Sequence, residues 1–414
     1  MNKTVAIIGG GAAGLSAAQH LRDGGAAVTV FERAQTLGGR ARSELLAGCM
    51  VDVGAQLFGS AFTSLYAFVQ TLGAQELLVR SPGRDAVLRG GTIHPITYGS
   101  VSSMITSRAL PASLKFRLAT RYVPFLLRHA SQLDACEPLA NGGDALEGES
   151  VAEWGARELG ADFVELLAYP LLGAYYGSTP EATSVVLYHA LAGAGMDVTL
   201  RAIRGGTGAL FQTAGDALRA RGARIELNRV VNQVSLANNS VLVDGVRFDG
   251  AVLAVPPRVV QSLFQPDPVT AEWLRGVRYS ASAVLALVLR ERIRADYFGI
   301  SIPRGGRGSD LVAICVAHQK APGLVPEDRT LLVCLGAPAA NESLIAHPET
   351  AVERMINSVE HVLPGTRSRI EHAKLYRHHD GYPLFYPGYL KHLRDFPVTA
   401  QTHNVMLAGD YLVS

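Results

Sequence analysis

Three glycines near the start of the chain have the spacing of a phosphate-binding turn. Gly9, Gly11 and Gly14 fit the pattern G-x-G-x-x-G. The first glycine of such a turn permits a tight bend, the second lets a pyrophosphate approach the backbone, and the third lets a helix pack closely on a strand. Glu32 comes eighteen positions after Gly14, where a carboxylate can accept hydrogen bonds from a ribose diol and would repel a 2′-phosphate. Together these residues predict a dinucleotide site.

The elements around this turn are those that such a site needs. Residues 4–8 are a short β-rich run, residues 15–21 repeat apolar positions at helical spacing, and residues 27–31 form a second β-rich run. The helix would begin at the glycines, so its free N–H groups and its dipole would face the phosphates. This order predicts the first βαβ unit of a doubly wound parallel sheet. A glycine-rich turn that binds nothing is the alternative.

Three later segments favour FAD over NAD as the dinucleotide. Residues 37–43 (LGGRARS) offer two glycines and a forked guanidinium to a second face of the pyrophosphate. Residues 51–56 indicate a strand that ends in small residues, where a flat ring could lie against the backbone. Residues 404–410 indicate another strand, and its final carboxylate could bind a polyol.

With these segments, the chain resembles the FAD-dependent amine oxidoreductase superfamily, which includes flavin amine oxidases, protoporphyrinogen oxidases and phytoene desaturases. Beside the glycine turn, the matching pieces are residues 37–43, 52–54, 229–231, 252–257 and 409–410, in the family's order. The resemblance implies FAD as the cofactor, with Val231 at the adenine and Asp410 on the ribityl chain. The cofactor-binding residues predicted in this way are Gly9, Gly11, Ala12, Ala13, Gly14, Glu32, Arg33, Gly39, Arg40, Gly54, Ala55, Gln56, Val231, Gly409 and Asp410. In relatives a helix that faces the flavin follows this strand, whereas the sequence here ends at Ser414.

The substrate half of the chain is more similar to protoporphyrinogen oxidases than to amine oxidases. Flavin amine oxidases generally keep a lysine near the flavin on a substrate-domain strand, and the strand expected here, residues 279–287, has none. Lys320 falls in a later turn, where we expect a solvated surface residue rather than that catalytic lysine. The segments that resemble protoporphyrinogen oxidases are residues 93–96, 149–154, 169–177, 204–210 and 299–304.

The resemblance predicts an FAD-dependent oxidoreductase that removes hydride from a C–H of an apolar or cyclic small molecule, as protoporphyrinogen oxidase-like proteins do. O₂ or another acceptor would reoxidise the flavin. No catalytic residue is identified, but Tyr386, Tyr389 and Tyr175 are candidates for the wall of the substrate site, with core packing as the alternative. The other possible functions are a flavin amine oxidase that acts on a C–N bond, an NAD dehydrogenase, and a flavin-binding protein without turnover.

Composition and charge exclude several classes of protein. The 414 residues hold 38 Lys and Arg against 36 Asp and Glu, so the chain lacks the basic excess of a nucleic-acid binder. No long uncharged apolar stretch indicates a membrane span, and few, scattered cysteines fit a reducing compartment, so we expect a cytoplasmic protein. An Arg-rich helical stretch near residues 110–130 could touch a membrane or cover the substrate. We expect no metal site, and we assign residues 378–380 (His-His-Asp) to a polar turn. The oligomeric state is left open.

The FAD-type segments stand at the start, in the middle and at the end of the chain, so the domains must be discontinuous. We predict an α/β fold with a doubly wound, Rossmann-type FAD-binding domain and an α+β substrate domain. The FAD-binding domain would comprise residues 1–80, 205–270 and 385–414. The substrate domain would comprise residues 81–204 and 271–384, with a helical lid at about residues 100–200 and a sheet near residues 276–384.

Overall fold

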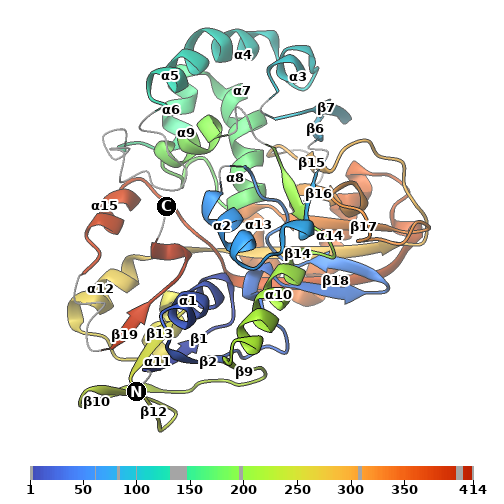
Figure 1. Ribbon diagram of the computed structural model, residues 1–414. Helices are drawn as coiled ribbons and strands as arrows, with labels where there is room; N and C mark the ends of the chain where they lie inside the picture. The colour runs from blue at the N-terminus through green and yellow to red at the C-terminus, as the bar shows by residue number, and fades with distance from the viewer. Residues whose placement is uncertain are drawn as a thin grey trace.

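The first feature of the fold is a five-stranded parallel sheet, with the strand order β19-β13-β1-β2-β9. The computed structural model describes residues 3–60, 62–81, 84–98, 100–130, 147–194, 199–305, 310–397 and 404–412. The strands of this sheet are β1 (Thr4–Ile8), β2 (Ala27–Phe31), β9 (Arg224–Glu226), β13 (Gly250–Leu253) and β19 (Val405–Leu407). They come from three distant stretches of sequence that meet in the lower part of Figure 1. The parallel doubly wound type of sheet predicted from the sequence is therefore confirmed.

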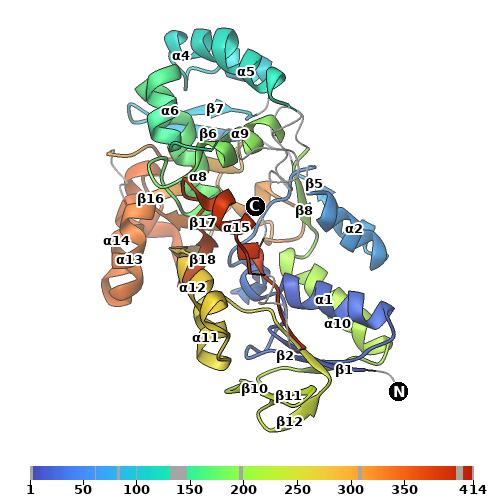
Figure 2. The same ribbon diagram turned by 90° about the vertical axis from the view of Figure 1, so that its left-hand side faces the viewer.

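Both faces of this sheet are covered, as the apolar run of β1 predicts. Val5 and Ile7 pack with helices α1 (Ala12–Asp23) and α10 (Thr207–Ala220), whereas Ala6 and Ile8 point to the opposite face. That face meets a small antiparallel sheet of β10 (Val234–Ala237), β11 (Ser240–Val243) and β12 (Val246–Phe248). Figure 2 shows α1 and α10 on one side of β1 and β2 and the small sheet below them.

The second large element is a seven-stranded, mostly antiparallel sheet with the order β18-β14-β17-β16-β15-β6-β7. Its strands are β6 (Asp85–Arg89), β7 (Thr92–Ile96), β14 (Tyr279–Leu289), β15 (Gly299–Ser301), β16 (Leu311–Val316), β17 (Thr330–Gly336) and β18 (Ile370–Pro383). One face packs on helices α13 (Pro338–Ala346) and α14 (Pro348–Val362). The other face packs on the hairpin of β3 (Ser43–Leu46) and β4 (Cys49–Asp52). This contact joins the two sheets.

One prediction about this sheet is wrong. Residues 378–380 do not form a polar turn but lie within β18, where His378 is paired with Ser282 of β14. The side chain of His378 explains its place in a strand, because its Nε2 lies 2.8 Å from the carbonyl oxygen of Val53. A polar residue in a strand is stable when its side chain reaches such a partner.

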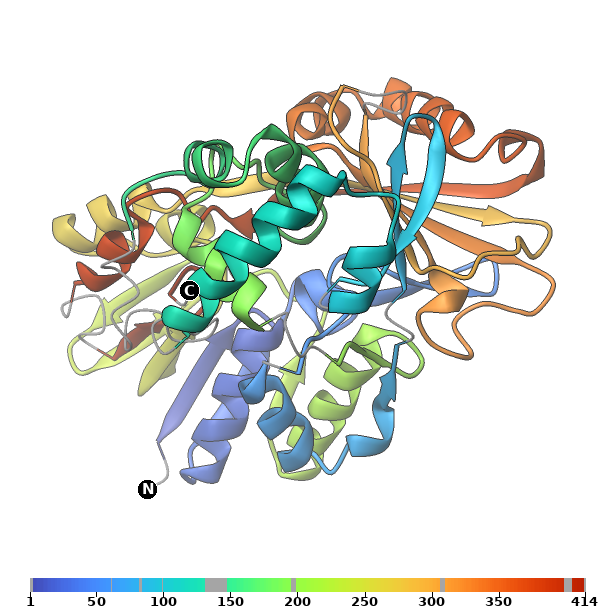
Figure 3. The ribbon, with the colours of Figure 1, turned by 90° about the horizontal axis from the view of Figure 1, so that it is seen from above.

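Helices gather above both sheets in the region predicted as a lid (Figures 1 and 3). They are α3 (Val101–Thr106), α4 (Ala112–Arg117), α5 (Val123–Arg128), α6 (Val151–Glu158), α7 (Ala161–Phe163), α8 (Tyr169–Tyr176) and α9 (Val185–Ala194). Single π-helical turns join α4 to α5 and α7 to α8. Trp154, Tyr122 and Phe163 pack their rings together at the centre of this region. The helical stretch expected near residues 110–130 is confirmed.

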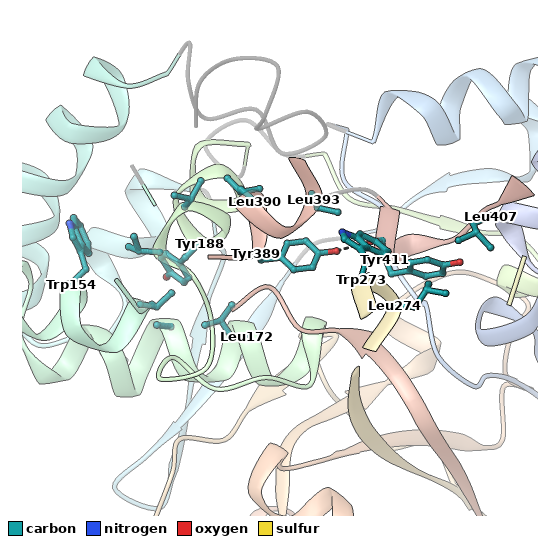
Figure 4. Packing of buried hydrophobic residues seen from close by; sticks show 14 of the residues in the cluster. Trp154, Leu172, Tyr188, Trp273, Leu274, Tyr389, Leu390, Leu393, Leu407 and Tyr411 are labelled. Atoms are coloured by element: carbon teal, nitrogen blue, oxygen red, sulfur yellow. Dashed lines mark hydrogen bonds between the residues drawn. The ribbon is translucent and has the colours of Figure 1, made fainter. Parts of the chain in front are cut away.

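A third group of elements connects the parallel sheet with the lid. It contains α11 (Pro257–Leu263), α12 (Pro268–Gly276) and α15 (Tyr389–Arg394). Figure 4 shows Trp273 of α12 beside Tyr389 and Tyr411. The ring centroids of Trp273 and Tyr411 are 6.4 Å apart. The remaining elements are α2 (Thr63–Thr71), β5 (Leu78–Arg80) and β8 (Arg201–Ile203). Among the described residues, no helix has the length and apolar character that crossing a bilayer requires. The predicted residue ranges of the two domains stay a prediction.

Candidate functional site

The glycine turn between β1 and α1 leaves no room for a side chain at Gly9 or Gly14. Gly9 has φ +110°, and a Cβ there would lie 2.4 Å from the carbonyl oxygen of Ala254. A Cβ on Gly14 would lie 1.9 Å from the carbonyl oxygen of Gly9, so only glycine permits this contact between helix and strand. Around Gly11 the nearest atom to a Cβ would be the Cα of Gly39, at 3.9 Å. No described side chain caps α1, so its first N–H groups are free to bind an anion.

Two other predicted segments pack against this turn. Gly38 donates its backbone N–H to the carbonyl oxygen of Gly10 at 2.9 Å and forms a parallel bridge with Gly11. Gly54 lies behind Arg40, because a Cβ on Gly54 would be 2.1 Å from the carbonyl oxygen of Arg40. The structure thus brings together the first glycine turn, residues 38–40 and the end of β4. No single sequence motif includes all three of these segments.

Glu32 lies at the end of β2 and faces the glycine turn. Its carboxylate accepts hydrogen bonds from the backbone N–H groups of Gly10 at 2.7 Å and Ala34 at 2.8 Å. The carbonyl oxygen of Glu32 accepts a hydrogen bond from the backbone N–H of Arg229 at 2.9 Å. Val231, two residues further along the chain, is buried. The end of β2 therefore positions both Glu32 and, through Arg229, the segment that contains Val231. Arg33, which was also predicted to bind the cofactor, is exposed to solvent.

Arg40 and Asp410 form an ion pair at 2.8 Å, with 38% and 37% of their side chains exposed. Asp410 also accepts a hydrogen bond from the hydroxyl of Tyr279 at 2.5 Å, and Arg40 donates one to the carbonyl oxygen of Gly381 at 2.9 Å. Burial and then the Asp410 charge raise the pKa of Tyr279, so this phenol stays a donor. Although burial acts to lower it, the pKa of Arg40 is raised by Asp410. Sequence motifs predicted Arg40 and Asp410 as cofactor-binding residues. Tyr279 was missed, because it belongs to no recognisable motif.

The prediction that Lys320 is a solvated surface residue is wrong. Lys320 follows the short helical turn Ala317–Gln319 and is 1% exposed. Its ammonium forms an ion pair with the Asp52 carboxylate at the end of β4. Asp52 also accepts hydrogen bonds from the Ser43 hydroxyl and, at 2.7 Å, from the Thr207 backbone N–H that begins α10. Burial of Asp52 explains the position of Lys320, because a buried carboxylate requires a countercharge.

The three tyrosines predicted for the substrate wall have different surroundings. Tyr386 donates its hydroxyl to the carbonyl oxygen of Gly276 at 3.3 Å. Tyr389 is buried and donates to the carbonyl oxygen of Tyr411 at 3.2 Å, as Figure 4 shows. Tyr175 is 41% exposed, whereas half of the residues of its helix, α8, are buried. Of these three, Tyr175 therefore presents the most free surface, and contact of any of them with substrate stays a prediction.

The donor set fits FAD. The first turn of α1 offers N–H groups for a pyrophosphate, and the carboxylates of Glu32 and Asp410 can accept hydrogen bonds from sugar and polyol hydroxyls. Ala55 lies between Gly54 and Gln56 in the segment expected at the ring and accepts a hydrogen bond from the Thr207 hydroxyl at 3.0 Å. The side-chain oxygen of Gln56 is buried without a hydrogen-bond partner in the described part of the chain. Such an atom requires a donor, which a ring N–H can supply.

The comparisons with known proteins agree with this donor set. The model of a family described as flavin containing amine oxidoreductase matches residues 12–413. Protoporphyrinogen oxidase 2 of Arabidopsis thaliana is 29% identical over 185 residues, 44% of this chain and 34% of the relative. Coproporphyrinogen III oxidase of Staphylococcus aureus is 28% identical over 191 residues, 45% of this chain and 39% of the relative. These alignments span less than half the length of either curated relative. The structure of cyclohexylamine oxidase from Brevibacterium oxydans is 17% identical, with a TM-score of 0.74 over 100% of this chain and 94% of that one, so the fold is shared.

Proposed function

We propose that this chain, which belongs to the flavin containing amine oxidoreductase family and has FAD as its cofactor, is an oxidoreductase that removes hydride from a C–H of a small apolar or cyclic molecule. The observation that carries the proposal is the convergence of the α1 N-terminus, Glu32 and the Arg40–Asp410 pair at the carboxyl end of the parallel sheet. In doubly wound sheets this edge is where a dinucleotide binds.

The residues of the chain supply binding and orientation, while FAD when bound supplies the capacity to accept a hydride. The N–H groups of α1 and the guanidinium of Arg40 would hold the pyrophosphate, and Glu32 would hold the ribose. Tyr279 keeps the Asp410 carboxylate oriented by its hydrogen bond of 2.5 Å. The helices above both sheets would exclude water from the reacting carbon, which favours hydride transfer over side reactions.

A porphyrinogen is the substrate class that we propose first, because the curated relatives named above are porphyrinogen oxidases. The absence of lysine from β14 (YSASAVLALVL) also argues against an ordinary flavin amine oxidase. Lys320 does not replace that residue, since its ammonium is bound to Asp52. Amine oxidation is the second candidate, because the family whose model matches the chain is described as flavin containing amine oxidoreductase.

We also propose a cytoplasmic protein that touches a membrane surface through its lid and passes electrons to O₂ or another acceptor. Ile105, Phe116 and Leu127 of α3, α4 and α5 are between 62% and 68% exposed. Arg121 and Arg128 belong to the same helical segment. Exposed apolar side chains among arginines are typical of a helix that lies on an anionic bilayer.

An anaerobic titration tests the proposed function. The holoenzyme would be mixed with coproporphyrinogen III, protoporphyrinogen IX or cyclohexylamine while the visible spectrum of the flavin is recorded. We expect a porphyrinogen to bleach the flavin within one turnover and air to restore the colour. Bleaching by the amine alone would favour the second candidate. A flavin that stays oxidised with every compound would overturn the proposal in favour of a flavin-binding protein without turnover.

A further inference from the structure

Asp85 is a half-buried carboxylate that the function proposed above does not use. It begins β6 and is paired with Gly299 of β15 in the seven-stranded sheet. A Cβ on Gly299 would lie 2.7 Å from Oδ1 of Asp85, so glycine leaves room for the carboxylate to lie against the neighbouring strand. Burial raises the pKa of Asp85 to about 7, and a hydrogen bond from the backbone of Gly299 opposes only part of that shift.

No side chain in the described part of the chain forms an ion pair with Asp85. Asp85 lines a hollow of about 360 Å³ at the edge of β7, where Arg84, His94, Arg108 and Asp296 are also present. None of these four side chains contributes to the pKa shift of Asp85, which comes from burial. A carboxylate partly withdrawn from water without a countercharge is unfavourable, and a ligand that brings a positive charge or a strong N–H donor relieves it.

The charge of Asp85 affects the pKa of groups from three other parts of the fold. Its carboxylate contributes to raising the pKa of Tyr98 beyond β7, Tyr175 on α8 and Cys315 on β16, although burial is the larger cause for each. Tyr175 as a whole residue is 41% exposed. Aromatic faces beside a carboxylate are a suitable environment for a cationic nitrogen, because ring and carboxylate both attract it.

Register connects Asp85 with the candidate FAD site. Gly299 is paired with Asp85 on one side and with Cys315 on the other, so these three residues form a row on one face of the sheet. Cys315 packs in the same cluster as Val51 of β4, the strand that leads to Gly54. Burial raises the pKa of Tyr382, the charge on Arg40 acts to lower it, and the Cys315 thiol acts to raise it. The row therefore lies on the sheet face that packs against β4.

We propose that Asp85 binds an N–H donor of the substrate, either a protonated amine or a pyrrole nitrogen, and thereby selects nitrogen-bearing molecules. The inference rests on the proposed function, because it takes the hollow that Asp85 lines as part of the substrate site. Asp85 would act as a specificity-determining residue. Its carboxylate would bind the nitrogen at the end of the molecule farther from the reacting carbon.

Two probes distinguish the two sources of the N–H group without turnover. tert-Butylammonium has no hydrogen on the carbon beside nitrogen, so it cannot be oxidised there. Coproporphyrinogen III can be bound to holoenzyme that dithionite has already reduced, which prevents its oxidation. Calorimetry would give the dissociation constant of each probe for the wild type, for Asp85→Asn, and for Asp296→Asn. Asp296 is the matched control, because it is an exposed aspartate that lines the same hollow.

We expect Asp85→Asn to weaken one probe by at least about tenfold, as loss of a charged hydrogen-bond partner does, and Asp296→Asn to leave it unchanged. Loss of tert-butylammonium identifies the ammonium source, and loss of the porphyrinogen alone identifies the pyrrole source. Equal binding to all three proteins, or no binding of either probe to the wild type, would overturn the inference. If Asp85→Asn does not fold, the wild type still decides, because binding of whichever probe binds must strengthen as pH rises through about 7 and Asp85 ionises. A flavin that no substrate reduces would refute the proposed function but leave these binding results readable.

Discussion

Replacing Lys320 with methionine removes the countercharge of a carboxylate that lies inside the protein. Both side chains are almost completely inaccessible, at 2% for Lys320 and 1% for Asp52. Breaking such a pair on one side costs about 3–5 kcal/mol, because the remaining charge is left buried. The hydrogen bonds to Asp52 from Ser43 and Thr207 survive the change and compensate in part. We therefore expect Lys320→Met to lower the free energy of unfolding by about 3 kcal/mol.

The assay is urea unfolding of the holoenzyme, with Lys374→Met as the matched control. Lys374 pairs with Glu44 at 2.6 Å, but the two side chains are 48% and 27% exposed, so its loss should cost about 0–1 kcal/mol. Combining Lys320→Met with Asp52→Asn should recover part of the stability, since no charge then remains unpaired. Equal effects of Lys320→Met and Lys374→Met would refute the buried-pair reasoning.

Three further changes test other parts of the account. Gly14→Ala should abolish FAD binding, because the new Cβ would lie 1.9 Å from the carbonyl oxygen of Gly9. The measurement is the amount of flavin per chain after gel filtration. Gly24→Ala is the control and should retain FAD, because its Cβ would have no neighbour closer than 3.5 Å. Tyr279→Phe should weaken FAD binding about tenfold by removing the donor to Asp410, and unchanged affinity would contradict that role. Since the folded-state pKa of Asp85, about 7, exceeds its ordinary value of 3.8, stability should fall as pH rises from about 4 to about 7, by at most about 4 kcal/mol. Asp85→Asn should flatten this unfolding profile, and a persistent slope would contradict the assignment.

Local patterns were sufficient to predict the first βαβ unit. The positions of Gly9, Gly14 and Glu32 are fixed by a strand, a turn and a helix that follow one another within thirty residues, so spacing alone carries the information. The strand expected at residues 279–287, which is part of β14, was predicted for the same reason. The confirmed α/β fold class follows from these local elements and from the resemblance to a known family.

Side chains whose partners lie far away in the sequence could not be placed in this way. Lys320 reaches Asp52 across 268 positions, and Tyr279 reaches Asp410 across 131. A lysine in a turn is more often solvated, and only the packing of β4 against the seven-stranded sheet shows that this one is buried. One signal was present in the sequence: Asp52 stands between two valines in a β-rich run, which indicates a buried acid that needs a partner.

The identity of the cofactor is the claim on which the rest depends, and mass spectrometry of the small molecules released from freshly purified, denatured protein tests it most directly. We predict FAD in an amount equimolar with the chain, and much less from Gly14→Ala. Recovery of NAD, or of no nucleotide from protein that is otherwise folded, would contradict the assignment of the glycine turn, Glu32 and the Arg40–Asp410 pair to one flavin site.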